Sequence, residues 1–207
     1  MSGLDRKSHW ERVYSEKQET EVSWFQETPA PSLDLLRLVN AGRESAIVDI
    51  GGGASRLVDE LVAQGYADVT VLDLSAAALL KARQRLGARA DGVTWIAADA
   101  TRWEPEQQRY DVWHDRAAFH FLTEPADQHA YVERLRRALK PGGHVIMGTF
   151  APDGPEKCSG LPVVRHDAAS LSELLGPRFT LVDERTHEHE TPWASVQKFQ
   201  FSTFRFG

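Results

Sequence analysis

Three consecutive glycines and three aspartates have the types and the spacing that a nucleoside-binding site requires. Asp49 lies just before the glycines, whereas Asp73 and Asp99 end two later apolar segments. A strand that runs through Gly51 and Gly53 into a helix would let a ligand reach backbone N–H groups at the positive end of that helix. A carboxylate at Asp73 could accept the ribose hydroxyls, and one at Asp99 could accept an adenine amino group. We therefore expect a nucleoside site at the carboxyl ends of three strands.

The glycine run does not fit the motif of a dinucleotide site. That motif needs a third glycine for close contact between helix and strand, and Arg56 occupies this position. The segment from Asp49 to Ser55 fits the pattern D-x-G-x-G-x-S instead. The alternatives are a tight turn without a ligand and aspartates that only cap helices. Three aspartates in equivalent places favour the nucleoside site.

A second group of polar residues follows the fourth apolar segment. Asp115 ends that segment and is expected to line the site, and Arg116 and His120 come after it. His120 could be a general base, because an unperturbed imidazole titrates at about pH 6.5. The alternatives are a packed, hydrogen-bonded His120 and a salt bridge between Arg116 and a nearby acid. We expect no metal, since His187 and His189 share one face of a predicted edge strand, where histidines are usually exposed.

Aromatic residues near the N-terminus and a single cysteine are further candidates. Trp24 and Phe25 lie in a predicted loop, where they could close over a ligand and offer a ring face to a cation. Alternatively, they fix the N-terminal segment to the sheet. Trp10 and Tyr14 have helical spacing and are expected to pack together. Cys158 follows the fifth predicted strand, close to the expected substrate opening, and we expect an inert thiol there.

Composition disfavours several classes of function. The chain of 207 residues has a formal net charge of −6, whereas nucleic-acid binding usually leaves a basic footprint. Cys158 is the only cysteine, so no internal disulfide can form, which fits a reducing compartment. No apolar run reaches the roughly 18 residues of a membrane span, and the charged first residues lack an apolar signal core. We expect a cytoplasmic protein that binds neither nucleic acid nor membrane.

Short apolar segments alternate with amphipathic segments between residues 46 and 150. This periodicity predicts strands and helices in turn. Ser75 is placed to cap one helix and Gly87 to end it, while Pro125 begins another. The predicted strands are 46–50, 68–74, 93–99, 110–115 and 144–150, and the predicted helices are 55–65, 76–87 and 125–143. The alternation predicts right-handed βαβ units and a parallel sheet.

The two ends of the chain depart from this alternation. Segments 179–190 and 196–206 are strand-like and are predicted to pair antiparallel at the sheet edge. The last segment holds two pairs of phenylalanines of opposite parity, and a bulge near Ser202 would turn both pairs toward the core. Near the N-terminus, helices are predicted around 10–17 and 32–39.

These segments predict one domain with three parts. Residues 1–42 form a helical arm and lid, and residues 43–150 form the ligand-binding core. Residues 151–207 form a substrate-side loop and the C-terminal antiparallel strands. We find no linker that would separate a second domain.

Five segments between residues 47 and 150 read "VDIGGGAS", "VTVLDLS", "WIAADAT", "YDVWHDRAAFHFL" and "LRRALKPGGHVIMGTF". In this order they resemble the motifs of class I S-adenosylmethionine-dependent methyltransferases. The N-terminal "HWERVYSEKQETEVSWFQE" is similar to the W-x-x-x-Y…W-F segment of a subgroup with small bacterial methyltransferases and some protein-lysine methyltransferases. Ser55 replaces the third glycine of the family's loop, a common variation that leaves cofactor binding intact.

The resemblance implies a fold, a cofactor and site residues. The implied fold is a Rossmann-like, doubly wound α/β fold, with a seven-stranded sheet that is parallel except for an antiparallel last strand. The implied cofactor is S-adenosyl-L-methionine, with Asp73 on the ribose, Asp99 near the adenine and the glycines beside the methionine part. The implied cofactor-binding residues are Trp24, Asp49, Gly51, Gly53, Asp73, Leu74, Asp99, Ala100 and Asp115. The candidates for a catalytic part are Asp115, Arg116 and His120.

Three functions stay open at this stage. Methyl transfer to a small molecule is the leading hypothesis, and Arg116 would favour an anionic or polar acceptor. A protein-lysine methyltransferase is the alternative, because the N-terminal segment is similar in both. A nucleoside-binding module without catalysis is less favoured, since the expected binding residues are intact. The sequence leaves open the acceptor atom, the need for a general base and the oligomeric state.

Overall fold

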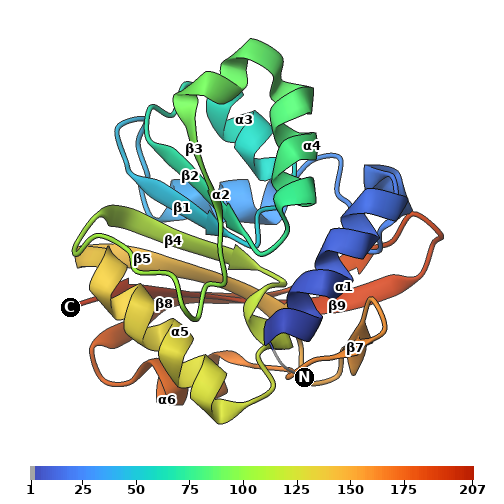
Figure 1. The fold of residues 1–207 in the computed structure, drawn as a ribbon. Coiled ribbons are helices and arrows are strands. Elements are labelled where there is room, and N and C mark those ends of the chain that lie inside the picture. Colours follow the sequence, from blue (N-terminus) through green and yellow to red (C-terminus); the bar gives the residue numbers. More distant parts are fainter. Residues whose placement is uncertain (1–2) are drawn as a thin grey trace.

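The computed structural model describes residues 3–207, and within them seven strands form one sheet (Figure 1). The strands are β1 (Ile47–Ile50), β2 (Val69–Asp73), β3 (Val93–Ala97), β4 (Tyr110–Arg116), β5 (Leu139–Phe150), β8 (Phe179–Glu190) and β9 (Val196–Phe206). Their order across the sheet is β3-β2-β1-β4-β5-β9-β8. The first five strands pair in parallel, whereas β9 is antiparallel to both β5 and β8. The predicted fold class is confirmed.

Helices cover both faces of this sheet. Apolar side chains of α2 (Ala30–Leu38), α3 (Leu57–Ala63) and α4 (Ala76–Leu86) share one buried cluster with one face of the strands. Those of α5 (Pro125–Ala138) and α6 (Ala168–Leu175) share a second cluster with the other face. The sheet is therefore buried between two layers, which explains the near-continuous apolar character of β1 and β2.

The signals at helix ends act largely as predicted. The Ser75 hydroxyl accepts the Ala78 N–H at 3.1 Å, and Gly87 ends α4 with a positive φ of 59°. Helix α5, however, ends at Ala138, before the predicted end at residue 143. Pro141 disfavours a helical conformation at the residue before it, so the chain from Leu139 onward is extended and joins β5.

The predicted bulge near Ser202 is wrong, because β9 is not an edge strand. Its pairing with β5 runs without interruption through Ser202, and the register shift lies in β8 between Leu181 and Asp183. Alternate residues of β9 therefore face opposite sides, and both sides are covered. Phe199 and Phe201 pack in the cluster with α2, whereas Phe204 and Phe206 pack in the cluster with α5 and α6.

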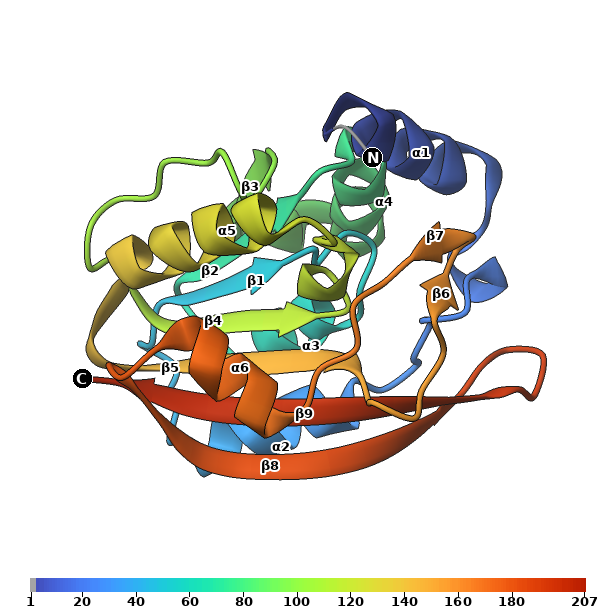
Figure 2. The same cartoon turned by 90° about the horizontal axis from the view of Figure 1, so that it is seen from below.

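The N-terminal arm and a small hairpin lie over the carboxyl ends of the parallel strands. Helix α1 (Gly3–Glu16) is longer than predicted and lies beside the hairpin of β6 (Lys157–Cys158) and β7 (Leu161–Pro162), as Figure 2 shows. His9 and Ser159 meet there, with 3.4 Å between Nε2 and Oγ. Three 3-10 turns complete the described elements: η1 (Glu19–Glu21), η2 (Gly87–Gly92) and η3 (Phe119–Phe121). No helix within residues 3–207 is long and apolar enough to cross a membrane.

Candidate functional site

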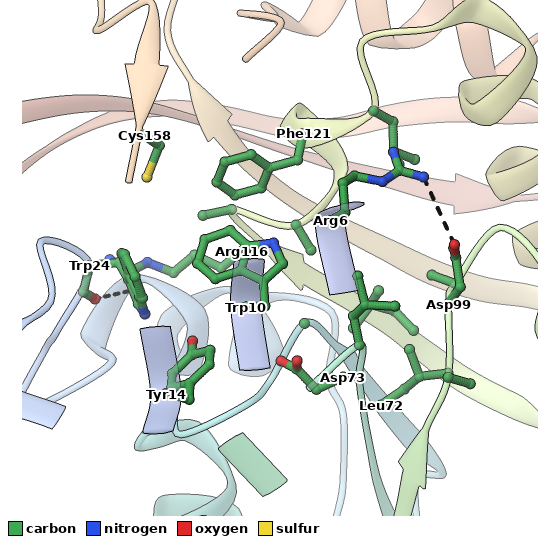
Figure 3. A pocket seen from close by; sticks show the side chains of 18 residues that line it. Arg6, Trp10, Tyr14, Trp24, Leu72, Asp73, Asp99, Arg116, Phe121 and Cys158 are labelled. Carbon is green, nitrogen blue, oxygen red and sulfur yellow. Dashed lines mark hydrogen bonds and ion pairs between the residues drawn. The ribbon is translucent and has the colours of Figure 1, made fainter. Parts of the chain in front are cut away.

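A pocket lies under α1, at the ends of the strands where the sequence predicts a nucleoside site (Figure 3). Seven of the predicted residues line it: Trp24, Gly51, Asp73, Leu74, Asp99, Ala100 and Arg116. The residues that sequence reasoning did not assign to a ligand are Arg6, Trp10, Tyr14, Ile50, Leu72, Ala98, Ala117, Ala118, Phe121, Leu122 and Cys158. We call this the nucleoside pocket, after the two aspartates that it holds.

A second pocket adjoins the first. The two pockets share Tyr14, Trp24, Gly51 and Arg116. The second is further lined by Asp49, by the glycine loop and by residues of the N-terminal arm and of β4, namely Glu19, Val22, Phe25, Gln26, Pro29, Ser32, Gly52, Ala54, Ser55, Arg56 and His114. We call it the loop pocket. Because the two pockets adjoin, one part of a ligand could occupy the first pocket and another part the second.

Asp73 ends β2 and is nearly buried in the nucleoside pocket. Its Oδ1 accepts the Ser75 N–H at 2.8 Å. A Cβ atom on Gly53 would lie 2.7 Å from Asp73 Oδ2, so only glycine leaves room at this turn, where φ is +39°. Burial raises the pKa of Asp73 to about 7, and the nearby carboxylates of Asp49 and Glu11 act in the same direction.

Asp99 lines the same pocket. Its Oδ1 accepts the N–H and the hydroxyl of Thr101, at 2.9 and 2.7 Å. Arg6 of α1 reaches over the pocket to Asp99 Oδ2 at 3.8 Å and to Asp127 at 3.0 Å. Asp99 Oδ2 thus lies near a cation that sequence reasoning missed. No sequence signal marked Arg6, because its partners come from distant segments.

Glu11 explains why α1 lies over the pocket. Its carboxylate accepts the N–H groups of Ala76 and Ala77, at 2.8 and 3.2 Å, and the hydroxyl of Ser75 at 3.1 Å. These are first-turn N–H groups of α4, which have no partner within their own helix. A carboxylate is also favourable at the positive end of a helix. Glu11 therefore fastens α1 to α4.

The segment of residues 21–27, which we call the lid segment, lines the pockets and is held there by contacts with other elements. The Trp24 ring lies 5.5 Å from that of Trp10 and 6.1 Å from that of Tyr14. Arg116 Nη1 donates to the Trp24 carbonyl at 3.0 Å, and His189 Nε2 donates to the carbonyl of Ser23 at 2.6 Å. His189 is buried, contrary to the expectation of exposure, because the lid segment packs on its edge strand.

Arg116 ends β4 on the wall that the two pockets share. Its Nε and Nη2 atoms are shielded from solvent and have no hydrogen-bond partner among residues 3–207. The guanidinium lies 5.2 Å from the centre of the Phe199 ring. Arg116 forms no ion pair with an acidic side chain among residues 3–207. Burial lowers the pKa of Arg116 to about 10, so it stays cationic at neutral pH. Two donors of a buried cation are thus unused.

Asp115 is placed behind the pocket wall. Its carboxylate is fully buried and accepts the N–H groups of Ala118 and Phe119, at 3.0 and 3.1 Å, and the Tyr131 hydroxyl at 2.5 Å. Burial raises the pKa of Asp115 to about 6. Asp115 lines neither pocket and holds the turn at Ala117 and Ala118, which line the nucleoside pocket.

His120 lies in the core and lines neither pocket. The Phe150 N–H donates to its Nδ1 at 3.4 Å, and the imidazole is fully buried. Burial lowers the pKa of His120 to about 3, so the ring is neutral at physiological pH. These contacts support the packed alternative for His120.

Cys158 is the one cysteine of the chain, and it lies at the nucleoside pocket. The Cys158 thiol lines the nucleoside pocket from the β6–β7 hairpin, and burial raises its pKa to about 11. It is therefore a thiol and not a thiolate at neutral pH. Within residues 3–207, no cluster of three or more His, Cys, Asp or Glu side chains could hold a metal ion.

Comparisons with known proteins connect this site to one kind of chemistry. A family model described as a methyltransferase domain matches residues 47–143. A malonyl-[acyl-carrier protein] O-methyltransferase of Paenibacillus is 29% identical over 53% of this chain and 40% of its own length. A mouse eEF1A lysine and N-terminal methyltransferase is 23% identical over 94% of this chain and 30% of its own length. This chain thus spans less than half of the length of either curated relative.

Solved structures of methyltransferases share the fold. One is the Burkholderia thailandensis 1,6-didemethyltoxoflavin-N1-methyltransferase, solved with its substrate and S-adenosylhomocysteine. It has a TM-score of 0.68 and 21% sequence identity, and the match covers 100% of this chain and 91% of that one. At this identity the match supports the architecture of the sheet and helices.

Proposed function

We propose that this chain is a class I S-adenosylmethionine-dependent methyltransferase and that it methylates a small molecule that carries an anionic group. The cofactor of this family supplies a methyl group that is already activated on a sulfonium. The protein must align the acceptor with that group and exclude water. Such positioning alone can lower a barrier by about 7–11 kcal/mol.

The pockets suit a ligand made of a nucleoside and an amino acid. Asp73 and Asp99 both line the nucleoside pocket, and each accepts backbone hydrogen bonds with its Oδ1, so the Oδ2 atoms are the candidates to meet ribose hydroxyls and an adenine amino group. The loop pocket holds a buried carboxylate oxygen of Asp49 without a partner among residues 3–207. A buried, unpaired carboxylate oxygen is costly unless a ligand supplies a donor. The amino-acid part of the cofactor carries such a donor, so the residues fit this cofactor.

The observation that carries the proposal on the acceptor is the guanidinium of Arg116. Arg116 lines both pockets, and its Nε and Nη2 atoms are shielded from water and have no partner among residues 3–207. A buried charged group without partners is unfavourable, and a guanidinium can donate to both oxygens of a carboxylate at once. An acceptor with a carboxylate or a similar anionic group would satisfy both donors and be oriented by them.

A lysine side chain fits the site less well. A protonated lysine would bring a second cation next to Arg116, and like charges in a site of low dielectric repel each other. Residues of helix α1 and of the lid segment also line the pockets, and the β6–β7 hairpin adds Cys158 to the wall of the nucleoside pocket (Figure 3). These features favour a small acceptor over the side chain of a protein.

The test uses a cell extract that is separated into protein and small-molecule fractions and then supplied with tritiated S-adenosylmethionine. We expect the wild-type protein to label the small molecules that bind to an anion-exchange column. Arg116→Gln should reduce this labelling by roughly 10- to 100-fold, the scale of lost hydrogen bonds to a charged group. The exposed arginine variant Arg102→Gln is the control and should label like the wild type.

Binding measurements separate the other outcomes. Arg116→Gln should bind S-adenosylhomocysteine within about threefold of the wild type, because the acceptor and not the cofactor uses this guanidinium. Weaker binding of S-adenosylhomocysteine, with unchanged binding of methylthioadenosine, would assign Arg116 to the cofactor's carboxylate. Label in the protein fraction would favour the lysine alternative. Binding without any label would favour a module without catalysis.

A further inference from the structure

Three buried polar side chains in the wall of the loop pocket form a chain of hydrogen bonds. His114 of β4 lies between Asp49 of β1 and Ser32 of α2. Its Nδ1 is 2.7 Å from Asp49 Oδ1, and its Nε2 is 2.8 Å from Ser32 Oγ. The exposed fractions are 1% for Ser32 and 2% for both His114 and Asp49. Solvent is thus excluded from all three residues.

The direction of each hydrogen bond follows from the chemistry of the three groups. A carboxylate only accepts, so His114 Nδ1 carries the hydrogen that points to Asp49. In the neutral imidazole, Nε2 then holds the lone pair, and the Ser32 hydroxyl donates to it. The carboxylate therefore fixes the tautomer of His114, the Ser32 hydroxyl adapts to it, and His114 fixes one oxygen of Asp49.

The free end of this chain is the other oxygen of Asp49. Asp49 Oδ2 is buried and has no partner among the residues that the structure describes, although Asp49 lines the loop pocket. A Cβ atom on Gly52 would lie 2.5 Å from this oxygen, so glycine at this position leaves space beside it. A buried carboxylate oxygen with space beside it is suited to a cationic donor.

We propose that Ser32 and His114 are positioning residues that orient Asp49 so that its Oδ2 binds the ammonium group of the cofactor's methionine part. This inference rests on the proposed function, since it takes the cofactor as the ligand of both pockets. The nucleoside pocket holds the two aspartates suited to adenosine, and the loop pocket adjoins it through a common wall. The amino-acid part, with the only ammonium group of the cofactor, then falls to the loop pocket.

The hydrogen-bonded chain fixes the orientation of the Asp49 carboxylate, which packing alone does not. The carboxylate of an aspartate rotates easily about the Cβ–Cγ bond, and such a rotation in Asp49 would turn Oδ2 away from the ligand. The bond from Nδ1 fixes this rotation, and Ser32 ties the imidazole to α2. The same three side chains activate the serine in serine hydrolases, where the hydroxyl meets the substrate. Here all three residues line the loop pocket, but the Ser32 hydroxyl is bonded to His114, whereas Asp49 keeps a buried oxygen that has no partner among residues 3–207.

The test compares two ligands that differ only in the amino-acid part. S-adenosylhomocysteine carries the ammonium group, whereas methylthioadenosine has the same nucleoside without the amino acid. We expect calorimetry to show that His114→Phe weakens S-adenosylhomocysteine by about 10- to 100-fold and changes methylthioadenosine by less than about twofold, the scale of one charged hydrogen bond. Ser32→Ala should show the same selectivity with a smaller loss, about three- to tenfold.

Two further variants separate positioning from folding. His114→Asn keeps an N–H donor near the place of Nδ1 and should recover most of the affinity for S-adenosylhomocysteine. Tyr110→Phe removes another buried hydrogen bond of the sheet, from the Tyr110 hydroxyl to Thr70, and should leave both affinities unchanged. If His114→Phe does not fold, Ser32→Ala and His114→Asn carry the comparison.

Several outcomes would overturn the inference. Equal losses for both ligands would make the chain a structural element, and unchanged binding of S-adenosylhomocysteine in Ser32→Ala and His114→Phe would show that Asp49 needs no orientation. Labelling of Ser32 by a fluorophosphonate would make the hydroxyl, and not the carboxylate, the reactive end. A wild-type protein that binds neither ligand would refute the proposed function instead.

Discussion

The buried carboxyl group of Asp73 should lower the stability of the ligand-free chain by an amount that depends on pH. The carboxyl group keeps its proton in the folded, ligand-free chain up to a pH of about 7, whereas its ordinary pKa is 3.8. Because the unfolded chain releases the proton first, the folded state loses stability as the pH rises from about 4 to 7. Above that range the penalty is constant. Neutral Asn at this position should remove the penalty, so we consider the variant Asp73→Asn.

The size of the effect follows from the shift of about three pKa units. Each unit corresponds to about 1.4 kcal/mol, so the full penalty is at most about 4 kcal/mol, of which about 2–3 kcal/mol develops between pH 5 and pH 8. The Asn side chain keeps an oxygen for the Ser75 N–H, at the position of Oδ1. The variant loses the hydrogen bond from the Gly53 N–H, and this loss changes its free energy of unfolding relative to the wild type by the same amount at every pH. The change with pH is thus the quantity to measure.

Urea unfolding of the ligand-free protein at pH 5 and pH 8 measures this change. We expect the free energy of unfolding of Asp73→Asn, relative to the wild type, to rise by about 2–3 kcal/mol between the two values. Asp91→Asn, which changes an exposed carboxylate, is the control and should show no such change. The variant should also bind S-adenosylhomocysteine roughly 10- to 150-fold more weakly. A difference in stability that is the same at both pH values would refute the argument from burial.

Three further predictions concern the parts around the pockets. Cleavage by a Glu-specific protease within Glu21–Glu27 should slow several-fold with S-adenosylhomocysteine, and equal rates with and without it would make Trp24 purely structural. Glu11→Gln should weaken binding of S-adenosylhomocysteine about threefold or more, because α1 is then held less firmly on α4. Calorimetry would measure the affinity, and an unchanged melting temperature would show that the variant is folded. Tyr131→Phe removes a donor to Asp115 and should lower the free energy of unfolding at pH 8 by about 1–3 kcal/mol, and an unchanged value would argue against that hydrogen bond.

The sequence predicted the parts of the fold that depend on local periodicity and on residues at element ends. The alternation of strands and helices places Asp73 and Asp99 at the same edge of the sheet, and the structure puts both in one pocket. Ser75 could be recognised as a cap because its partner N–H lies three residues away. In each of these cases the interaction lies within one element or follows from the topology of a parallel sheet.

Contacts between distant segments could not be predicted in this way. Glu11 caps the N-terminus of α4, more than 60 residues away in the chain, and its sequence position marks it only as a helical glutamate. The β6–β7 hairpin has strands of two residues each, too short for a periodic pattern. The burial of His189 depends on the lid segment, which reaches it from the opposite end of the chain.

The placement of Asp115 and Arg116 follows from the alternation of side chains along β4. Successive residues of a strand face opposite sides of the sheet, so Trp113 and Asp115 share one face, and His114 and Arg116 share the other. Trp113 donates to the Tyr131 hydroxyl at 2.8 Å, and that hydroxyl donates to Asp115. His114 and Arg116, on the opposite parity, both line the loop pocket. Asp115 thus lies on the face where Trp113 and Tyr131 pack in the cluster with α5 and α6, and this favours Arg116 over Asp115 as the group that meets the acceptor.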